Sequence, residues 1–175
     1  MARVHGGARE GSAPLSRAEL ERAIPEGDTL LLDTSSLASY FGNEPTSPVA
    51  AAVVDGFVRP GRNRAVVSVV SATELLVRPL RSGKGGVERS VLEFLRTFPN
   101  VELVSVDLTI ARLAAALRVR EGMKVPDALI AASGFDRSAA VALSDDADWP
   151  ALLVGPAATM RVIALRSFLP FPARK

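Results

Sequence analysis

Short apolar runs alternate with amphipathic segments along most of this chain. The apolar runs are bounded by turn residues, which predicts buried strands at 29–33, 65–70, 101–106, 139–143 and 160–165. Apolar residues at helical spacing between them predict helices at 35–41, 48–58, 71–78, 87–98, 107–120 and 126–133. Strands that alternate with helices favour an α/β fold, a three-layer α/β/α sandwich around a parallel sheet.

The first residues lack this alternation. Residues 1–14 are rich in Gly, Ala and Arg without periodicity, which predicts disorder. Ser16 and Glu19 form a capping-box pattern, so a short helix is expected over 16–24. We therefore expect an N-terminal extension over 1–28 and one folded domain over 29–175.

Two of the predicted helices have recognisable ends. Asp107 precedes a long apolar stripe and is expected to be the N-cap of that helix. Gly134 follows the last predicted helix and is expected at its C′ position, where a left-handed residue is common.

Four acidic residues fall where the predicted elements meet. Asp33 and Glu74 follow buried runs, Asp146 follows the fourth strand beside Asp145, and Asp127 opens the helix that leads into that strand. Carboxyl ends of parallel strands lie at one edge of a sheet, so these carboxylates should converge. Converging carboxylates repel one another, and a cation between them would relieve that repulsion. Hard oxygen ligands suit Mg²⁺ or Mn²⁺ better than zinc or copper.

Each acid also has a simpler structural interpretation. Asp33 is a plausible N-cap, Glu74 completes a capping box with Ser71, and Asp127 suits the positive end of a helix. The acids of 145–148 suit a turn. For any one acid alone the structural interpretation is preferred, and it is the shared sheet edge that favours a metal site.

The composition limits the chemistry. The chain has 175 residues, no Cys and one His, so thiolate chemistry is excluded. His5 lies in a Gly- and Ala-rich stretch and is interpreted as solvated, so a Ser–His–Asp triad is not expected. No apolar run is long enough for a membrane span and the first residues lack the apolar core of a secretory signal, which makes the cytoplasm the expected location.

Positive charge is concentrated in one stretch, although the net charge is only +2. Residues 59–89 carry seven cations against two acids. Such a stretch can follow a phosphate backbone, while a solvated surface is the simpler interpretation.

Four motifs in order resemble the PIN domain, and most closely the VapC-type toxins of bacterial toxin–antitoxin modules. They are an apolar run with Asp-Thr-Ser at 31–35, Ser-x-x-Glu-Leu at 71–75, Pro-Asp-Ala-Leu-Ile-Ala-Ala at 126–132 and Ser-x-Asp-x-Asp-Trp at 144–149. The resemblance extends from about residue 29 to residue 165.

This resemblance implies a Mg²⁺- or Mn²⁺-dependent endoribonuclease that cuts structured tRNA or rRNA. The family's catalytic and metal-binding acids match Asp33, Glu74, Asp127 and Asp146, with Asp148 as a further ligand. Ser35 and Ser144 match its supporting polar residues. Candidates for contact with RNA are Arg78, Arg81, Lys84, Arg112, Arg118, Arg120 and Lys124.

The resemblance also implies a five-stranded parallel sheet of order 3-2-1-4-5, a homodimer and a small VapB-type antitoxin that covers the acidic groove. The chain departs from the family in three places. The extension precedes a strand that usually lies near the N-terminus, Trp149 stands where Phe is usual, and the pair Asp145–Asp146 leaves the fourth ligand open.

Three other functions are alternatives to a toxin nuclease. A PIN nuclease of RNA processing would have no antitoxin, and a non-catalytic module would use its acidic groove to bind a basic partner. A phosphate-accepting Asp of the haloacid-phosphatase type is disfavoured, because the residue two positions after Asp33 is Ser35 rather than a second Asp.

Overall fold

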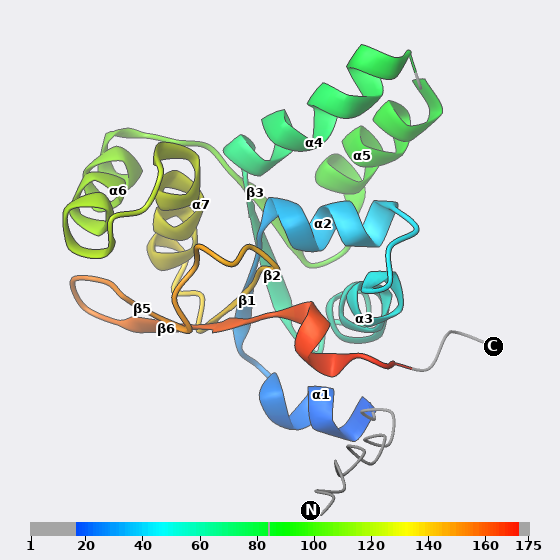
Figure 1. Ribbon diagram of the computed structural model, residues 1–175, viewed down its shortest axis with the longest axis horizontal. Helices are drawn as coiled ribbons and strands as arrows, with labels where there is room; N and C mark the ends of the chain where they lie inside the picture. The colour runs from blue at the N-terminus through cyan, green and yellow to red at the C-terminus, as the bar shows by residue number, and fades with distance from the viewer. Residues whose placement is uncertain (1–16, 84, 172–175) are drawn as a thin grey trace, which may run out of the picture.

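The computed structural model describes residues 17–83 and 85–171, so the expectations for residues 1–14, Ser16 and Lys84 lie outside the described residues. Six strands form one sheet with the order β3-β2-β1-β4-β6-β5 (Figure 1). The strands are β1 (Thr29–Leu32), β2 (Arg64–Ser68), β3 (Val101–Val104), β4 (Val141–Leu143), β5 (Leu152–Val154) and β6 (Thr159–Ile163).

The five predicted strands pair in parallel and in the predicted order, with β6 as the fifth. The difference is an added edge strand, β5, which runs antiparallel to β6. A tight turn joins the two, closed by a hydrogen bond from Gly155 N to Ala158 O of 2.8 Å. The short apolar run at 152–154 therefore forms half of a hairpin.

Helices cover both faces of the sheet. In Figure 1, α6 and α7 lie on one side, while α2, α3 and η1 lie on the other and α4 and α5 project together as a pair. Their bounds are α1 (Arg17–Ala23), α2 (Thr34–Phe41), α3 (Ser47–Val53), the π-helical η1 (Val54–Val58), α4 (Val69–Ser82), α5 (Gly85–Thr97), α6 (Leu108–Glu121), α7 (Val125–Asp136) and the 3-10 turn η2 (Leu165–Phe168).

The central strands β1, β2 and β4 are buried on both faces, which explains their continuous apolar runs. In β1, Leu30 and Leu32 belong to the core beneath α2 and α3, while Leu31 belongs to the core beneath α6 and α7. The alternation follows from the two-residue period of a strand. The predicted three-layer α/β/α architecture is confirmed.

Several predicted helix ends differ from the structure. The N-cap of α4 is Ser68, whose hydroxyl accepts from Val70 N, so the capping box of Ser71 and Glu74 is wrong. The predicted helix over 48–58 consists of α3 followed by the π-helical turn η1. The predicted cap at Asp107 is confirmed by a 2.9 Å hydrogen bond from Ile110 N.

Gly134 is inside α7 rather than at its C′ position, so that prediction is wrong. The reason for glycine here is close packing. A Cβ at this position would lie 2.9 Å from Leu31 Cδ2 and 3.2 Å from Met160 Sδ. The missing side chain lets α7 approach β1 and β6 closely.

The segment before β1 packs into the same core as the rest of the fold. Leu20 and Ile24 are fully buried with Phe57 of η1. The Asn63 amide, itself buried, donates to the carbonyls of Pro25 and Asp28 at 2.8 and 2.9 Å. Residues 17–28 are thus held both by apolar burial and by hydrogen bonds to the chain just before β2.

Candidate active site

Asp33 lies directly after β1 and is 4% exposed. Its Oδ2 accepts from the hydroxyls of Ser35 at 2.8 Å and Ser144 at 2.7 Å. Ser144 follows β4, the strand paired with β1, so the two serines reach the carboxylate from two neighbouring strand ends. Hydrogen bonds of this kind fix the orientation of the carboxylate.

The same serines hold the turn after β4. The Ser35 hydroxyl accepts from Asp145 N at 2.8 Å, and the Ser144 hydroxyl accepts from Asp146 N at 3.2 Å. The supporting polar residues predicted from the sequence therefore connect Asp33 to the segment that carries the fourth acid.

Glu74 lies in α4 and reaches the residue next to Asp33. The Thr34 hydroxyl donates to Glu74 Oε2 at 2.5 Å. The bond joins the first residue of α2 to α4, forty positions along the chain. Sequence analysis missed the contact of Thr34, although Thr34 is the middle residue of the Asp-Thr-Ser motif.

Asp127 is half-buried in the first turn of α7, and its pKa is raised. Burial is the largest cause, and the charge of Asp146 is the next. The indole N–H of Trp149 acts in the opposite direction, although it has no hydrogen-bond partner of ordinary geometry. Asp33 and Glu74 raise the pKa of Asp127 further, so the other three predicted acids all act on Asp127.

The three acids of the last motif occupy different surroundings. Asp145 Oδ1 accepts from Arg166 N at 3.0 Å, which directs this carboxylate to the start of η2. Asp148 forms an ion pair with Lys124 at 2.6 Å. Asp146 remains as the acid of this turn whose charge acts on Asp127.

The donor chemistry of this edge fits a hard divalent cation. Four carboxylates from separate elements share one region, and their mutual repulsion would be relieved by such an ion. Within residues 17–83 and 85–171, however, no three acidic or histidine side chains are gathered closely enough to enclose an ion as they stand. The residue types, all hard oxygen donors, fit Mg²⁺ or Mn²⁺.

A hollow of about 240 Å³ adjoins Asp127. Its walls come from the end of α6, the start of α7 and the turn after β4, and the lining residues are Glu121, Gly122, Met123, Lys124, Asp127, Asp148 and Trp149. Lys124 is the described RNA-contact candidate that lines this hollow. Arg78 and Arg81 are exposed on α4, and Arg112 is exposed on α6.

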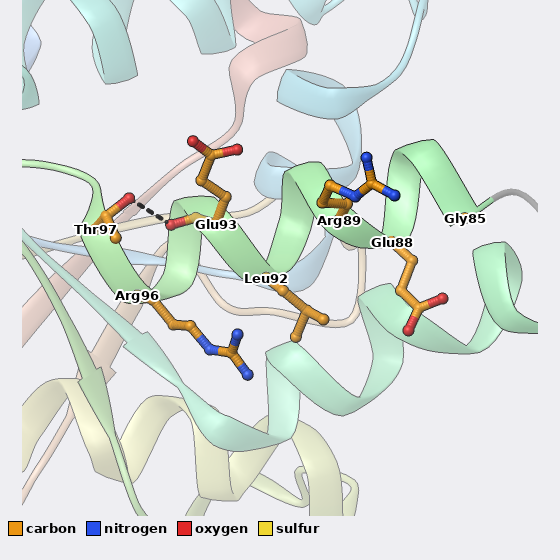
Figure 2. Close-up of a pocket in the computed structure, with 7 residues that line it drawn as sticks. All are labelled: Gly85, Glu88, Arg89, Leu92, Glu93, Arg96 and Thr97. Atoms are coloured by element: carbon orange, nitrogen blue, oxygen red, sulfur yellow. Dashed lines mark hydrogen bonds between the residues drawn. The ribbon is translucent and has the colours of Figure 1, made fainter.

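A second hollow, of about 590 Å³, runs along α5. Figure 2 shows Leu92 and Arg96 on one side of this helix and Glu93 on the other, with the Thr97 hydroxyl bonded to the Glu93 carbonyl. The hollow is lined by Gly85, Glu88, Arg89, Leu92, Glu93, Arg96 and Thr97. None of the predicted acids lines it, so the acidic edge and the hollow on α5 are separate features.

The family model of the PIN domain matches residues 30–152, and the chain belongs to the PIN-domain family. This range contains the four predicted acids and the two serines that support them, Asp33, Ser35, Glu74, Asp127, Ser144 and Asp146. No curated protein sequence matches the chain. None of the helices in the described residues is long and apolar enough to cross a membrane.

Solved structures share the fold at low sequence identity. VapC20 of Mycobacterium tuberculosis, titled a sarcin–ricin loop cleaving toxin, is 15% identical with a TM-score of 0.57, and the match covers 69% of this chain and 91% of that one. VapBC2 of Rickettsia felis bound to promoter DNA is 16% identical with a TM-score of 0.55, and the match covers 78% of this chain and 98% of that one. A toxin–antitoxin complex from Klebsiella pneumoniae is 19% identical with a TM-score of 0.53, and the match covers 67% of this chain and 86% of that one.

Proposed function

We propose that this protein is a divalent-metal-dependent endoribonuclease and the toxin of a toxin–antitoxin pair. The observation that carries the proposal is a hydrogen-bonded group of acids at one edge of a PIN-domain sheet, in which Ser144 joins Asp33 to the turn that carries Asp146. Thr34, the residue next to Asp33, holds Glu74 at the same edge. Like charges gathered beside buried strands are unfavourable for folding alone, so a function that needs them is the simplest explanation.

The four acids are proposed to hold Mg²⁺ or Mn²⁺. When bound, such an ion stabilises charge on a phosphate and lowers the pKa of a water molecule. Asp33 is the most firmly placed of the four, because it is buried and accepts from two serine hydroxyls. Glu74 is held by Thr34 from the adjoining helix. We propose Asp146 rather than Asp145 as the fourth acid, since Asp145 is engaged with Arg166.

RNA is proposed as the substrate, in the form of structured tRNA or rRNA. The exposed cations on α4, Arg78 and Arg81, and Arg112 on α6 are candidates to hold its backbone. The structural likeness to a toxin that cleaves the sarcin–ricin loop supports an RNA substrate.

An antitoxin and a second copy of the chain are the proposed protein partners. One of the similar structures is a toxin–antitoxin complex and another is VapBC2 bound to promoter DNA, which supports the first of these partners. A PIN nuclease of RNA processing would share the same acids and lack the antitoxin. A neighbouring reading frame for a short DNA-binding protein would favour the toxin.

The test is cleavage of a total-RNA pool by purified protein with Mg²⁺, Mn²⁺ or EDTA, beside Asp33→Asn. Discrete fragments that require both metal and Asp33 are expected. Cleavage that persists in Asp33→Asn would exclude the proposed site. If no RNA is cut and no Mn²⁺ binds in calorimetry, the acidic edge would instead be a docking surface for a basic partner.

A further inference from the structure

Lys124 is at an unusual position for a lysine. It is the N-cap of α7, and its side chain makes no capping hydrogen bond. A lysine there has no acceptor to offer the free backbone N–H groups and places positive charge at the positive end of the helix dipole. Residues that break a local rule without a structural gain are expected at functional sites.

The ammonium group of Lys124 is held in place from the opposite side of the site. Its Nζ lies 2.6 Å from Asp148 Oδ2, although both side chains are exposed at 69% and 62%. Asp148 is in turn fixed by its backbone N–H, which donates to Asp146 Oδ1 at 2.9 Å. The ion pair therefore connects the start of α7 to the turn after β4, the two segments that carry Asp127 and Asp146.

The hollow of about 240 Å³ beside Asp127 lies between these two segments. Met123 and Trp149, both almost fully buried, supply apolar wall, and Lys124 supplies the cation. The Trp149 indole N–H is buried beside Asp127, whose pKa it lowers, so it is not a free donor to a ligand. A space with an apolar wall and a cation suits a nucleotide better than it suits a metal ion alone.

From this arrangement we infer that Lys124 contacts an RNA phosphate beside the acidic edge and that Asp148 is a positioning residue that orients Lys124, rather than a metal ligand. The inference rests on the proposed nuclease function and deepens it. It also changes the role that the sequence motif suggested for Asp148. The carboxylate of Asp148 faces Lys124, and the charges that act on Asp127 come from Asp146, Asp33 and Glu74.

The first experiment separates a ligand from a positioning residue. Mn²⁺ binding to the full chain is measured by calorimetry for the wild type, Asp146→Asn and Asp148→Asn, two neighbouring acids of one turn. Asp146→Asn should weaken Mn²⁺ binding about tenfold or more. Asp148→Asn should leave it within about twofold, since the acid removed binds Lys124. Equal losses in the two variants would make Asp148 a ligand and overturn the inference.

The second experiment measures RNA binding without cleavage. A fluorescein-labelled tRNA pool is titrated in EDTA with the wild type, Lys124→Met, Lys124→Arg and Asp148→Asn over a range of salt. Lys124→Met should weaken binding about fivefold and lower the slope of log K against log salt by roughly one, the signature of one lost phosphate contact. Lys124→Arg should keep most of the affinity because it keeps the charge.

The double variant decides whether Asp148 acts through Lys124. Asp148→Asn should weaken tRNA binding by about twofold alone and have no further effect in Lys124→Met. Additive losses, or tRNA binding by Lys124→Met equal to that of the wild type, would overturn the inference while the proposed nuclease stands. If the wild type itself cuts no RNA and binds no Mn²⁺, both the proposed function and this inference fail.

Discussion

The hydroxyl of Thr34 donates to the carboxylate of Glu74 across 2.5 Å, from the first residue of α2 to α4. Glu74 is exposed on α4, and the bond from Thr34 holds its carboxylate near the sheet edge. The position of this acid therefore depends on a neighbour of Asp33, which connects two of the four acids through the backbone between residues 33 and 34.

Replacing Thr34 by Val should impair the site and leave the fold intact. The change keeps the shape of the side chain and removes the donor that orients Glu74. We expect Mn²⁺ affinity and any RNA cleavage to fall about tenfold, as for other residues that orient metal ligands. Thr73→Val is the matched control, because the Thr73 hydroxyl is exposed and donates only to Val69 O. Equal losses in both variants would show that the hydrogen bond to Glu74 has no special role.

Asp127→Asn should stabilise the metal-free protein at neutral pH. The folded state raises the pKa of Asp127, chiefly by burial and then by the charge of Asp146. A group with a raised pKa contributes most to stability below its unfolded value, near 3.9, and loses that contribution as the pH rises through its folded pKa. Thermal unfolding in EDTA should thus show a higher Tm for Asp127→Asn at pH 7 and no difference below about pH 4. Excess Mn²⁺ should reverse the order.

The single tyrosine of the chain should titrate above its ordinary range. Burial raises the pKa of Tyr40, and the nearby charge of Asp55 raises it further. The Tyr40 hydroxyl donates a hydrogen bond to Asp55 Oδ1 at 3.0 Å. Tyrosinate absorbance therefore reports this residue alone and should appear at a higher pH in the folded protein than in guanidinium chloride. Asp55→Asn should move the midpoint down. The fold favours the neutral phenol of Tyr40. The contribution of Tyr40 to the free energy of unfolding is therefore lost as the pH rises through its folded pKa.

Leu20→Ala should destabilise the whole domain. Leu20 is fully buried in the core beneath α2 and α3, although it belongs to the segment before β1. Truncating a buried leucine costs about 2–5 kcal/mol, measurable by urea unfolding. Arg22→Ala on the exposed side of the same helix should cost well under 1 kcal/mol. A neutral Leu20→Ala would mean that α1 is an appendage with no share in the core.

Gly134→Ala should also destabilise, by about 1–3 kcal/mol, because the new methyl group would meet Leu31 and Met160. Gly86→Ala is the control, since Gly86 lies in α5 with open space at its Cβ position. There the usual helix preference for alanine should stabilise by up to about 1 kcal/mol. Urea unfolding tests the packing argument directly, because the free energy of unfolding should fall in Gly134→Ala and rise in Gly86→Ala.

Most of the fold could be predicted because its signals are local. Runs such as 29–33 and 139–143 are buried on both faces, so their apolar character alone marks them as strands. The start of α4 was misplaced because Val69 and Val70 continue the apolar run of β2 after the strand has ended at Ser68. A change from strand to helix within one apolar run leaves no break in the pattern.

The grouping of the acids has a signal in the sequence, since Asp33 and the pair at 145–146 come just after strands that end at one sheet edge. The individual partners of the acids could not be predicted. The bonds of Thr34 to Glu74 and of Lys124 to Asp148 span 40 and 24 positions, and they depend on how helices and turns pack, which no local pattern encodes. Gly134 shows the same limit. A glycine near the end of a predicted helix can mark the helix end or a point of close packing, and the sequence looks the same in both cases.

The placement of Tyr40 and Trp149 gives this protein one natural optical reporter on each side of its sheet. Tyr40 packs with Phe41, Phe94 and Phe98 against the core beneath α2 and α3. Trp149, the single tryptophan, belongs to the core beneath α6 and α7. Tyrosine and tryptophan spectra therefore follow the two halves separately during denaturation. Coincident transitions would mean that the halves melt as one cooperative unit, whereas staggered ones would identify the half that opens first.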